Sequence, residues 1–557
     1  MRLGRASRRR RHGRAGAAGG AHAPARCGGR RVIVRDPDAL VLGGTVDGLV
    51  AAAVLARAGR TVLLLEPSER CGGRARTEEF HPGFRASATL HASGGLHPRV
   101  VEELELQRHG YAALWPLERG VTTLRTDGPP LRLTAEGPEG PLSEDDAEGY
   151  LGLRAFLDRV VPALRPLLVQ EPLPFRRPSW RELLASAGHA LRLRALGRED
   201  LLELLRVAPA CLADFTEDWL RDDALRATVA FPGLLCLSAG PRSPGTTLAL
   251  LLHEALSFEG GLGRGSLPKG GLGTIGGALE DAARRAGVVF LCGERPRELV
   301  VEGGVARGVR LEDGRVLGAG VVLSSLGPRT TLLELLPPGL LGPSVRRGLL
   351  AYRDRGATAV LRYALGELPT APVDAEALAG HVQIGADLDE LERAFDDAKY
   401  GRWSQAPVVD LCFPSLTDPS LAPAGRHVAT ALAQFAPYTL REGSWEHERE
   451  AFADAVTARI DAHLPGFAAA VLAREVLVPP DLEERYGLEG GHLHGGDLAL
   501  DQLFTNRPLP AAGTYATPVE RLYLTGGATH PGGPPSGAAG YAAARRILRE
   551  GKARAAR

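Results

Sequence analysis

The stretch Ala39-Leu40-Val41-Leu42-Gly43-Gly44-Thr45-Val46-Asp47-Gly48 passes from an apolar run into a short glycine-rich segment. The apolar run predicts a buried strand. A helical pattern rich in Ala and Leu follows over residues 49–58, and Gly59 stands where a helix commonly ends. A second apolar run, residues 61–65, predicts another strand and leads directly to Glu66. The order strand, glycine turn, helix, strand and acid predicts a βαβ unit.

This unit has the arrangement of a dinucleotide-binding site. Its glycine turn aims a helix N-terminus at a pyrophosphate, where free N–H groups and the helix dipole favour negative charge. Glu66 stands at the spacing, roughly 20 residues, at which a carboxylate accepts hydrogen bonds from the adenosine ribose. The same carboxylate repels a 2′-phosphate, so NADP is disfavoured. The residues predicted to contact the nucleotide here are Gly43, Gly44, Thr45, Asp47, Gly48 and Glu66.

A second glycine pair, Gly72-Gly73, follows Glu66 closely and is succeeded by Arg74. An acid followed by Gly-Gly-Arg resembles the FAD-dependent amine oxidases and phytoene desaturases. In that group the second glycine pair lets the backbone approach the flavin side of the pyrophosphate. The resemblance implies that the cofactor is FAD and that Gly72, Gly73 and Arg74 contact it.

Three further blocks narrow the resemblance. They are Gly270-Gly271-Leu272-Gly273-Thr274, the region 481–503 with Gly490-Gly491-His492, and Leu522-Tyr523-Leu524-Thr525-Gly526-Gly527 with His530-Pro531-Gly532-Gly533. Together they resemble the pyridine nucleotide-disulfide oxidoreductase domain-containing protein 2 group and its bacterial phytoene desaturase-like relatives, over about residues 38–548. The resemblance implies that Gly526, Gly527, Gly532 and Gly533 lie at the flavin. It makes His530 the best single candidate for a catalytic histidine beside the flavin.

The resemblance also implies a fold. It is an α/β protein with a discontinuous Rossmann-like FAD-binding domain of the amine oxidase and phytoene desaturase type, and an inserted α+β substrate domain. We expect the FAD-binding domain in residues 36–115, 261–329 and 481–557, and the substrate domain in residues 116–260 and 330–480. Turn signals at Gly303-Gly304 and Asp313-Gly314 predict two hairpins of a small antiparallel ribbon.

The first 35 residues contain no Asp or Glu and are rich in Arg, Ala and Gly. They lack the apolar middle region of a secretory signal. We expect either a disordered basic leader or an organelle transit segment. The dominance of Arg over Lys along the chain favours a bacterial source and the cytoplasm, whereas a transit segment in a eukaryote would place the protein in the mitochondrial matrix.

Composition excludes several classes of function. The 67 basic and 66 acidic residues nearly cancel, which argues against a nucleic-acid binder. No run of about 18 apolar residues predicts a transmembrane helix. The amphipathic residues 180–196 could touch a membrane that holds an apolar substrate, although packing against the core is the alternative. The six cysteines are scattered and form no Cys-x-x-Cys pair, so neither a redox disulfide nor a metal site is expected.

The sequence departs in four places from the pattern of the group it resembles. Thr45 replaces the middle glycine of the first turn, where the backbone approaches the pyrophosphate. Pro296 stands where a valine N–H usually holds the adenine, and proline has no N–H. Pro534-Pro535 replaces a glycine-rich continuation, and Gly495 replaces a frequent histidine. Our hypothesis is that FAD binds more weakly here than in other members of the group.

The leading interpretation is an FAD-dependent oxidoreductase of the dehydrogenase or desaturase type, which transfers hydride from a small apolar organic substrate to flavin. The first alternative is a non-catalytic relative that binds FAD poorly and acts through partners. The second is a flavin amine oxidase, which the 5% aromatic content makes less favourable because an aromatic cage would hold the amine. No nucleophile or zinc motif is present, in keeping with chemistry that a flavin supplies.

Overall fold

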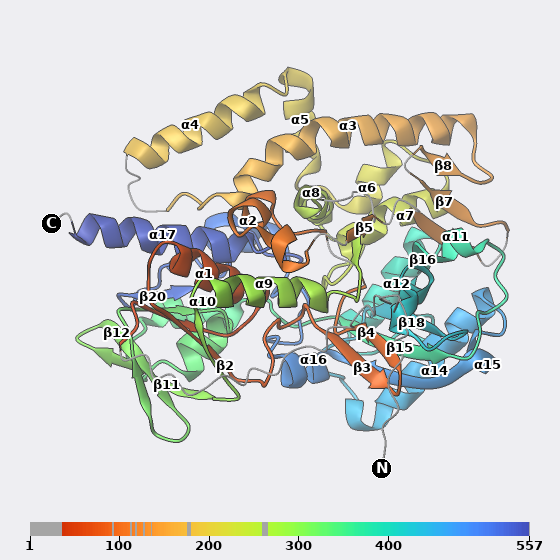
Figure 1. Ribbon diagram of the computed structural model, residues 1–557. Helices are drawn as coiled ribbons and strands as arrows, with labels where there is room; N and C mark the ends of the chain where they lie inside the picture. Colours follow the sequence, from red (N-terminus) through yellow and green to blue (C-terminus); the bar gives the residue numbers. More distant parts are fainter. Residues whose placement is uncertain are drawn as a thin grey trace, which may run out of the picture.

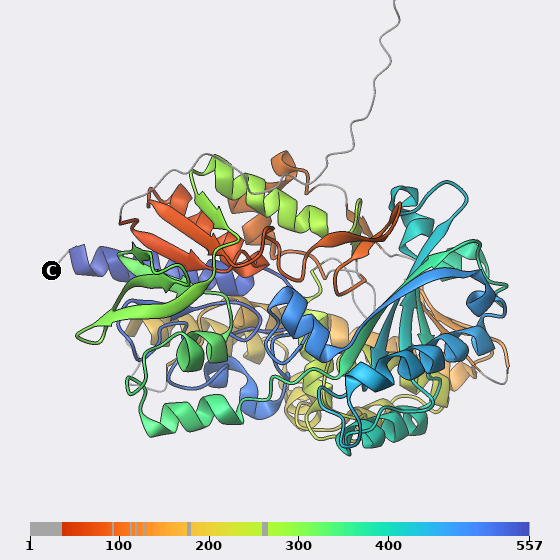
Figure 2. The ribbon, with the colours of Figure 1, turned by 90° about the horizontal axis from the view of Figure 1, so that it is seen from below.

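The computed structural model describes residues 36–91, 94–111, 114–116, 120–125, 128–134, 136–174, 180–258 and 266–555. The predicted basic leader, residues 1–35, lies outside them. Two sheets dominate the described part of the chain, and Figure 2 shows them side by side. One sheet is parallel and has five strands, and the other is mixed and has eight.

The parallel sheet has the strand order β10-β2-β1-β14-β20. Its strands are β1 (Ala39–Leu42), β2 (Val62–Glu66), β10 (Val289–Cys292), β14 (Val321–Ser324) and β20 (Leu522–Leu524). Every neighbouring pair in it is parallel. Strands far apart in the sequence therefore share one sheet, and their carboxyl ends meet at one edge.

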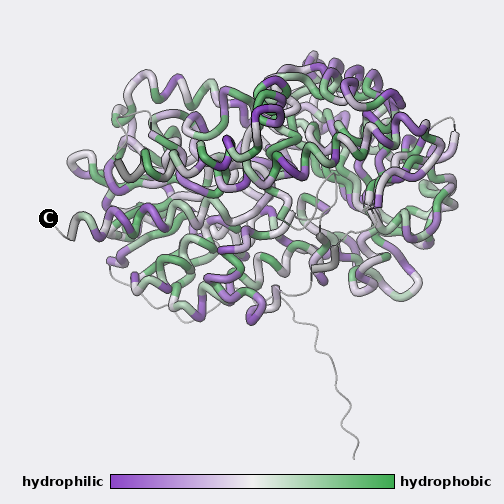
Figure 3. The backbone as a smooth tube through the Cα atoms, turned by 90° about the horizontal axis from the view of Figure 1, so that it is seen from above, coloured by the Kyte–Doolittle hydropathy of each residue, from purple (hydrophilic) through white to green (hydrophobic). Residues whose placement is uncertain are grey.

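Three helices cover one face of this sheet: α1 (Val46–Arg57), α9 (Gly273–Arg285) and α17 (Ala538–Ala555). Alternate strand residues such as Ala39, Val41 and Leu64 pack against them. Helix α1 is apolar nearly all round because it lies between the sheet and both other helices. Along α17, which ends at the C label of Figure 3, hydrophobic and hydrophilic residues alternate, as expected for a helix with one buried face.

The opposite face of the parallel sheet carries a small antiparallel sheet of β11 (Pro296–Glu302), β12 (Val305–Leu311) and β13 (Val316–Gly318). The strand residues that point to this side, including Leu40 and Leu42, pack against Leu299 and Val309. Antiparallel pairing of β11 with β12 and of β12 with β13 confirms the two predicted hairpins. The result is a layer of helices, a parallel sheet and an antiparallel sheet, which confirms the predicted Rossmann-like α/β fold.

The eight-stranded sheet has the order β19-β15-β18-β17-β16-β6-β7-β8. Its strands are β6 (Val121–Leu124), β7 (Leu131–Leu133), β8 (Pro138–Glu139), β15 (Thr358–Leu365), β16 (His381–Ile384), β17 (Val408–Cys412), β18 (His427–Gln434) and β19 (Val471–Leu477). Helix α14 (Trp445–His463) packs on one face through an apolar cluster. Helices α3 (Glu144–Val169), α7 (Asp223–Leu234) and α8 (Thr246–Leu256) form a second helical layer (Figure 1).

The described part of the chain also contains two small ribbons and ten further α-helices. Two small ribbons are β3 (Thr77–His81) with β4 (Phe84–Ser87), and β5 (Leu114–Pro116) with β9 (Ser266–Pro268). The other α-helices are α2 (Pro98–Glu103), α4 (Trp180–Arg194), α5 (Arg198–Val207), α6 (Leu212–Glu217), α10 (Pro343–Ala351), α11 (Ala375–Leu378), α12 (Leu388–Lys399), α13 (Pro414–Thr417), α15 (Phe467–Ala470) and α16 (Pro479–Tyr486).

The chain passes more than once between the two sheets. The parallel sheet draws its strands from within residues 36–115, 261–329 and 481–557, and the eight-stranded sheet from the segments between them. Residues 330–351 lie in the second set by number, yet Leu332 and Leu349 pack under the parallel sheet. The exact division into two domains stays a prediction. None of the helices in the described part of the chain combines the length and apolar character that crossing a bilayer requires.

Candidate cofactor site

The glycine turn after β1 is held by contacts that leave no room for side chains. Gly43 has φ +92°, and its N–H donates to Leu65 O at 2.8 Å. A Cβ on Gly43 would lie 2.6 Å from Ser325 Oγ. A Cβ on Gly48 would lie 2.1 Å from Gly43 O. The first and last glycines of the turn are therefore required by backbone conformation and close packing.

Thr45 is the N-cap of α1. Its φ is −69° and its ψ is 171°, and its Oγ1 accepts a hydrogen bond from Gly48 N–H at 3.1 Å. The expected cost of a β-branched residue at a positive φ does not arise, because this position is extended. The hydroxyl proton of Thr45 is still available to an acceptor outside the helix.

Glu66 ends β2 beside the glycine turn. Its Oε2 accepts from Gly44 N–H at 2.6 Å. Its Oε1 accepts from the N–H of Ser68 at 2.9 Å and from the hydroxyl of Ser68 at 2.6 Å. The carboxylate is buried, with Arg76 Nη2 at 3.8 Å. The structure thus fixes the acid at the edge of the sheet where the turn begins.

The second glycine pair packs directly on the first turn. Gly72 has φ +114° and Gly73 has φ +54°. The N–H of Gly72 donates to Gly44 O at 2.6 Å, and a bridge joins Gly72 to Thr45. These contacts bring the two glycine motifs together in space.

Arg74 and Asp47 form a buried pair of opposite charge. Asp47 Oδ1 accepts from Gly540 N–H at 3.1 Å, and Arg74 Nη1 donates to Leu493 O. Burial raises the pKa of Asp47, against the lowering effect of the Arg74 charge. Burial likewise lowers the pKa of Arg74, and the charge of Asp47 opposes that shift.

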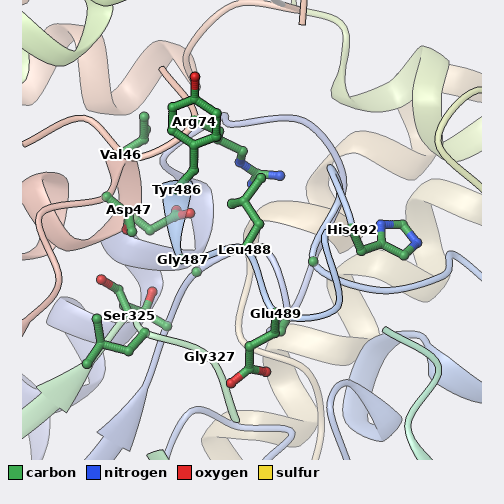
Figure 4. A pocket seen from close by; sticks show the side chains of 17 residues that line it. Val46, Asp47, Arg74, Ser325, Gly327, Tyr486, Gly487, Leu488, Glu489 and His492 are labelled. Carbon is green, nitrogen blue, oxygen red and sulfur yellow. The ribbon is translucent and has the colours of Figure 1, made fainter. Parts of the chain in front are cut away.

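A pocket opens where these segments meet (Figure 4). The residues that line it are Thr45, Val46, Asp47, Arg74, Ser325, Leu326, Gly327, Tyr486, Gly487, Leu488, Glu489, His492, Gly495, Thr525, Gly526, Gly527 and Ala528. They follow the carboxyl ends of β1, β2, β14 and β20 or come from the end of α16 and the loop after it. Crevices at the carboxyl ends of parallel strands are where open α/β sheets bind ligands.

The C-terminal glycines surround a fully buried arginine. Arg507 donates through Nη2 to Gly527 O at 2.8 Å, to Gly496 O at 3.0 Å and to His494 O at 3.1 Å. A Cβ on Gly532 would lie 2.4 Å from Arg507 Nε. Gly526 and Gly527 line the pocket, whereas Gly532 and Gly533 lie behind it, against Arg507 and Leu256 respectively.

Ten of the predicted site residues are not among those that line the pocket: Gly43, Gly44, Gly48, Glu66, Gly72, Gly73, Pro296, His530, Gly532 and Gly533. Pro296 opens β11, where it pairs with Leu311. His530 is buried, and its Nε2 donates to Leu167 O of α3 at 3.1 Å. Burial lowers the pKa of His530 to about 4. The structure thus gives His530 a packing role against α3, and its catalytic role stays a prediction.

Sequence reasoning missed Ser325, Gly327 and Glu489. Ser325 and Gly327 immediately follow β14, so the rule that ligands lie beyond the carboxyl ends of strands could have found them. Glu489 accepts from the N–H groups of Thr330 at 2.6 Å and Arg329 at 3.2 Å. Burial raises the pKa of Glu489 to about 7. No sequence motif marks it.

Comparison with known proteins gives the family. Residues 41–104 match the model of the NAD(P)-binding Rossmann-like domain. The mouse pyridine nucleotide-disulfide oxidoreductase domain-containing protein 2 is 35% identical over 549 residues, which cover 92% of this chain and 93% of the mouse protein. The chain belongs to this family.

Members of more distant groups are similar to it over most of its length. A lycopene-forming phytoene desaturase from Paracoccus sp. is 24% identical over 91% of this chain and 96% of its own. Cyclohexylamine oxidase from Brevibacterium oxydans has a TM-score of 0.58 at 17% identity, covering 93% of this chain and all (100%) of its own. These likenesses place the pyridine nucleotide-disulfide oxidoreductase domain-containing protein 2 family in the same fold as amine oxidases.

Proposed function

We propose that the chain is an FAD-dependent oxidoreductase that transfers hydride from a small apolar organic substrate to flavin. The observation that carries the proposal is the convergence of three glycine-containing segments at one pocket: residues 43–48, residues 72–74 and residues 525–528. Its relatives support the reaction class, since the phytoene desaturases and amine oxidases among them are named for oxidations of organic molecules.

The donors at the pocket suit a pyrophosphate. Helix α1 points its N-terminus at this edge, and Arg74 supplies a buried cation. Anions bind at helix N-termini because free N–H groups and the helix dipole are favourable there. Thr525 Oγ1 is buried at the pocket and has no hydrogen-bond partner among the described residues. A polar ligand would satisfy that hydroxyl.

The acid at the end of β2 suits the adenosine ribose. A carboxylate offers about four lone-pair sites. The Glu66 carboxylate uses three of them on Gly44 and Ser68, which leaves capacity for a ribose hydroxyl. Its negative charge disfavours a 2′-phosphate, so FAD fits this position and NADP does not.

In this proposal FAD, when bound, would accept two electrons and a proton from the substrate as hydride. The protein binds and orients it. Arg74 offsets the charge of the pyrophosphate, Thr45 and Thr525 donate hydroxyl hydrogen bonds, and the glycines permit close approach of the backbone. The two N-terminal glycine turns are shaped by Gly43, Gly44, Gly48, Gly72 and Gly73. Gly526 and Gly527 line the pocket, and Gly532 and Gly533 lie behind them. Pro296 would lie at the adenine and could not donate an N–H to it.

The test is the visible spectrum of purified full-length protein, together with mass spectrometry of the molecules released on denaturation. We expect FAD, at less than one equivalent per chain as isolated, rising toward one when FAD is added. Arg74→Gln should weaken FAD binding at least tenfold, whereas Arg310→Gln, which changes a partly exposed side chain of β12, should leave it unchanged. Absence of flavin even after incubation with FAD would contradict the proposal.

The same measurements separate the alternatives. A full complement of tightly held FAD would overturn the hypothesis of weakened binding, and persistent absence of flavin would favour a non-catalytic relative that acts through partners. Turnover of amines in preference to polyenes or other alkyl compounds would favour an amine oxidase. We propose the cytoplasm, or the mitochondrial matrix in a eukaryote, as the compartment, and fractionation of the source cells would test it.

A further inference from the structure

The eight-stranded sheet has one apolar face and one polar face, and both are buried. Cross-strand register places alternate residues of β15 to β18 on the same side. On the side of α14 these residues are apolar, for example Val382, Leu411 and Ala431. On the other side they include His381, Gln383, Asp410, Thr430, Gln434 and Thr358. Burying polar groups is unfavourable unless they are satisfied, so this face needs an explanation.

An aspartate–histidine pair lies at the centre of the polar face. His381 Nδ1–H donates to both carboxylate oxygens of Asp410, each at 3.0 Å. Burial would raise the pKa of Asp410, but the charge and hydrogen bond of His381 hold it below its usual value. Asp410 reciprocally outweighs burial and raises the pKa of His381. Because Nδ1 is hydrogen-bonded to Asp410, Nε2 is the nitrogen of His381 that could contact a ligand.

The Nε2 of His381 makes no hydrogen bond within the described part of the chain. The carboxylate fixes the ring orientation, as an aspartate does for a catalytic histidine. When charged, the ring offers an N–H donor at Nε2. When neutral, it offers a lone pair there. The pair therefore presents one oriented nitrogen that lacks a partner.

His91 lies beside this pair. Its Nε2 lies 2.9 Å from Asp410 O, which can only accept, so Nε2 is the donor. Its Nδ1 therefore accepts from the Thr430 hydroxyl at 2.7 Å. Burial lowers the pKa of His91 to about 4, which keeps the ring neutral. Both nitrogens are satisfied, so His91 is structural.

His253 of α8, in the helical layer, lies within electrostatic reach of the pair. The ring is half-buried and makes no hydrogen bond among the described residues. Burial lowers its pKa to about 4, and the charges of His381 and Asp410 act on it in opposite directions. His253 also acts on the pKa of His494, which lies within electrostatic reach of Arg74 in the cofactor pocket.

We propose that His381 and His253 bind an oxygen atom, carbonyl or hydroxyl, on an otherwise apolar substrate, with Asp410 as the positioning residue for His381. The inference rests on the proposed function only in naming the bound compound as the substrate. A pure hydrocarbon would cover Nε2 of His381 and the ring of His253 without giving either a hydrogen-bond partner, which is unfavourable. An oxygen function accepts from Nε2–H of His381, and a hydroxyl can also donate to the neutral ring of His253.

The test compares three probes with one carbon skeleton: octane, octan-2-ol and octan-2-one. Binding to full-length protein is followed by saturation-transfer NMR. We expect at least one oxygenated probe to bind tenfold or more tightly than octane. Preference for the ketone identifies a carbonyl, and preference for the alcohol identifies a hydroxyl. Equal binding of all three probes would overturn the inference.

Matched variants locate the site. His381→Phe keeps a ring but removes both nitrogens, and should reduce the discrimination to less than twofold. His447→Phe makes the same change at an exposed position of α14, on the other side of the sheet, and should leave it intact. Full discrimination in His381→Phe would refute the assignment.

Chemical modification of the wild-type protein avoids any dependence on folding of a variant. Diethyl pyrocarbonate should modify His381 at Nε2, and should modify His253, because these nitrogens make no hydrogen bond within the described residues. It should spare His91. The favoured octyl probe should protect both. Modification that the probe does not slow would contradict the site.

The positioning role of Asp410 has its own readout. The titratable groups around His381 are Asp410, His91, His253 and Cys412. In Asp410→Asn, the pH at which ketone binding weakens should fall, because His381 loses the charge that keeps it protonated. Asp410→Glu should restore the wild-type profile in part. An unchanged pH profile in Asp410→Asn would leave Asp410 merely structural and refute its positioning role.

The FAD content of every sample is measured in parallel. Discrimination between probes in a protein that never takes up FAD would overturn the proposed function but support this site. Bound FAD without discrimination would overturn this site alone.

Discussion

Thr45 caps helix α1 and also lines the cofactor pocket. Its hydroxyl caps α1 by accepting from Gly48 N–H, and its extended backbone makes a glycine unnecessary for conformation. The remaining effect of a threonine in place of the usual glycine is steric, because the Thr45 side chain lines the pocket. The residue therefore limits how closely a pyrophosphate can approach.

Thr45→Gly should raise FAD affinity by about three- to tenfold, since the backbone can then approach the phosphates. Loss of the capping hydroxyl should lower the free energy of unfolding by only about 0.5 kcal/mol. Equilibrium titration with FAD and urea denaturation measure the two effects. Weaker FAD binding in Thr45→Gly would instead show that the hydroxyl donates to the cofactor.

Pro296→Val should also tighten FAD binding, by about two- to tenfold. The change restores one backbone N–H, and one hydrogen bond contributes roughly 0.5–1.5 kcal/mol. Arg297→Val is the control, because it introduces the same residue at the exposed neighbouring position of β11. Equal affinities for the two variants would remove Pro296 from the adenine site.

At the scale of elements, α9 shows how close packing holds the second glycine motif. Gly276 and Gly277 are neighbours in this helix, but they face different surroundings. A Cβ on Gly276 would lie 2.8 Å from Ala75 O and 3.2 Å from Gly72 Cα, whereas a Cβ on Gly277 would meet nothing within 4 Å. The helix therefore approaches residues 72–75 through one glycine only.

Gly276→Ala should lower the free energy of unfolding by about 1–3 kcal/mol, because the loop must shift. Gly277→Ala should raise it by about 0.5–1 kcal/mol, through helix propensity and reduced freedom of the unfolded chain. Urea denaturation of the two variants measures the contrast, and FAD titration should show weaker binding only in Gly276→Ala. Similar stabilities for the pair would refute the packing argument.

At the scale of the whole molecule, a buried arginine joins the eight-stranded sheet to the ribbon of β3 and β4 and to α16. Arg362 of β15 is fully buried and donates to Glu475 Oε2 at 2.8 Å and to Ala88 O at 2.6 Å. Tyr486 OH bonds both Arg362, at 2.8 Å, and Glu78 of β3, at 2.7 Å. Segments from both parts of the chain thus depend on one guanidinium.

Arg362→Met should lower the free energy of unfolding by about 3 kcal/mol, since removing one partner of a buried ion pair leaves the other unsatisfied. Arg310→Met, which breaks an exposed pair with Glu298, should cost less than about 1 kcal/mol. Both values come from urea denaturation at neutral pH. Comparable losses would mean that the Arg362 network contributes little.

The same network predicts a dependence on pH. Burial alone would raise the pKa of Glu78, but the hydrogen bond from Tyr486 and the charges of Arg485 and Arg362 hold it below its usual value. Its contribution to stability is therefore complete above the unfolded pKa, about 4.3. It is lost as the pH falls below that value. Glu78→Gln should flatten the acid limb of a stability–pH curve, and an unchanged limb would contradict this.

Local patterns in the sequence predicted the parallel sheet well. The strand at 39–42 was placed correctly, and the next strand is displaced by one residue, at Val62–Glu66 instead of 61–65. The helix begins at Val46 and not at 49, because Thr45 already caps it. Such elements are predictable because apolar runs, glycines and caps act over a few residues.

The sequence by itself determined the βαβ unit, its acid at position 66 and the resemblance that names FAD. Only the tertiary structure brought Arg74 to Asp47, placed Glu489 at the pocket, and joined His381, Asp410 and His253. Those residues stand from tens to hundreds of positions apart, and no local rule relates them. Their meeting depends on strand order and cross-strand register, which long-range packing of the whole chain decides.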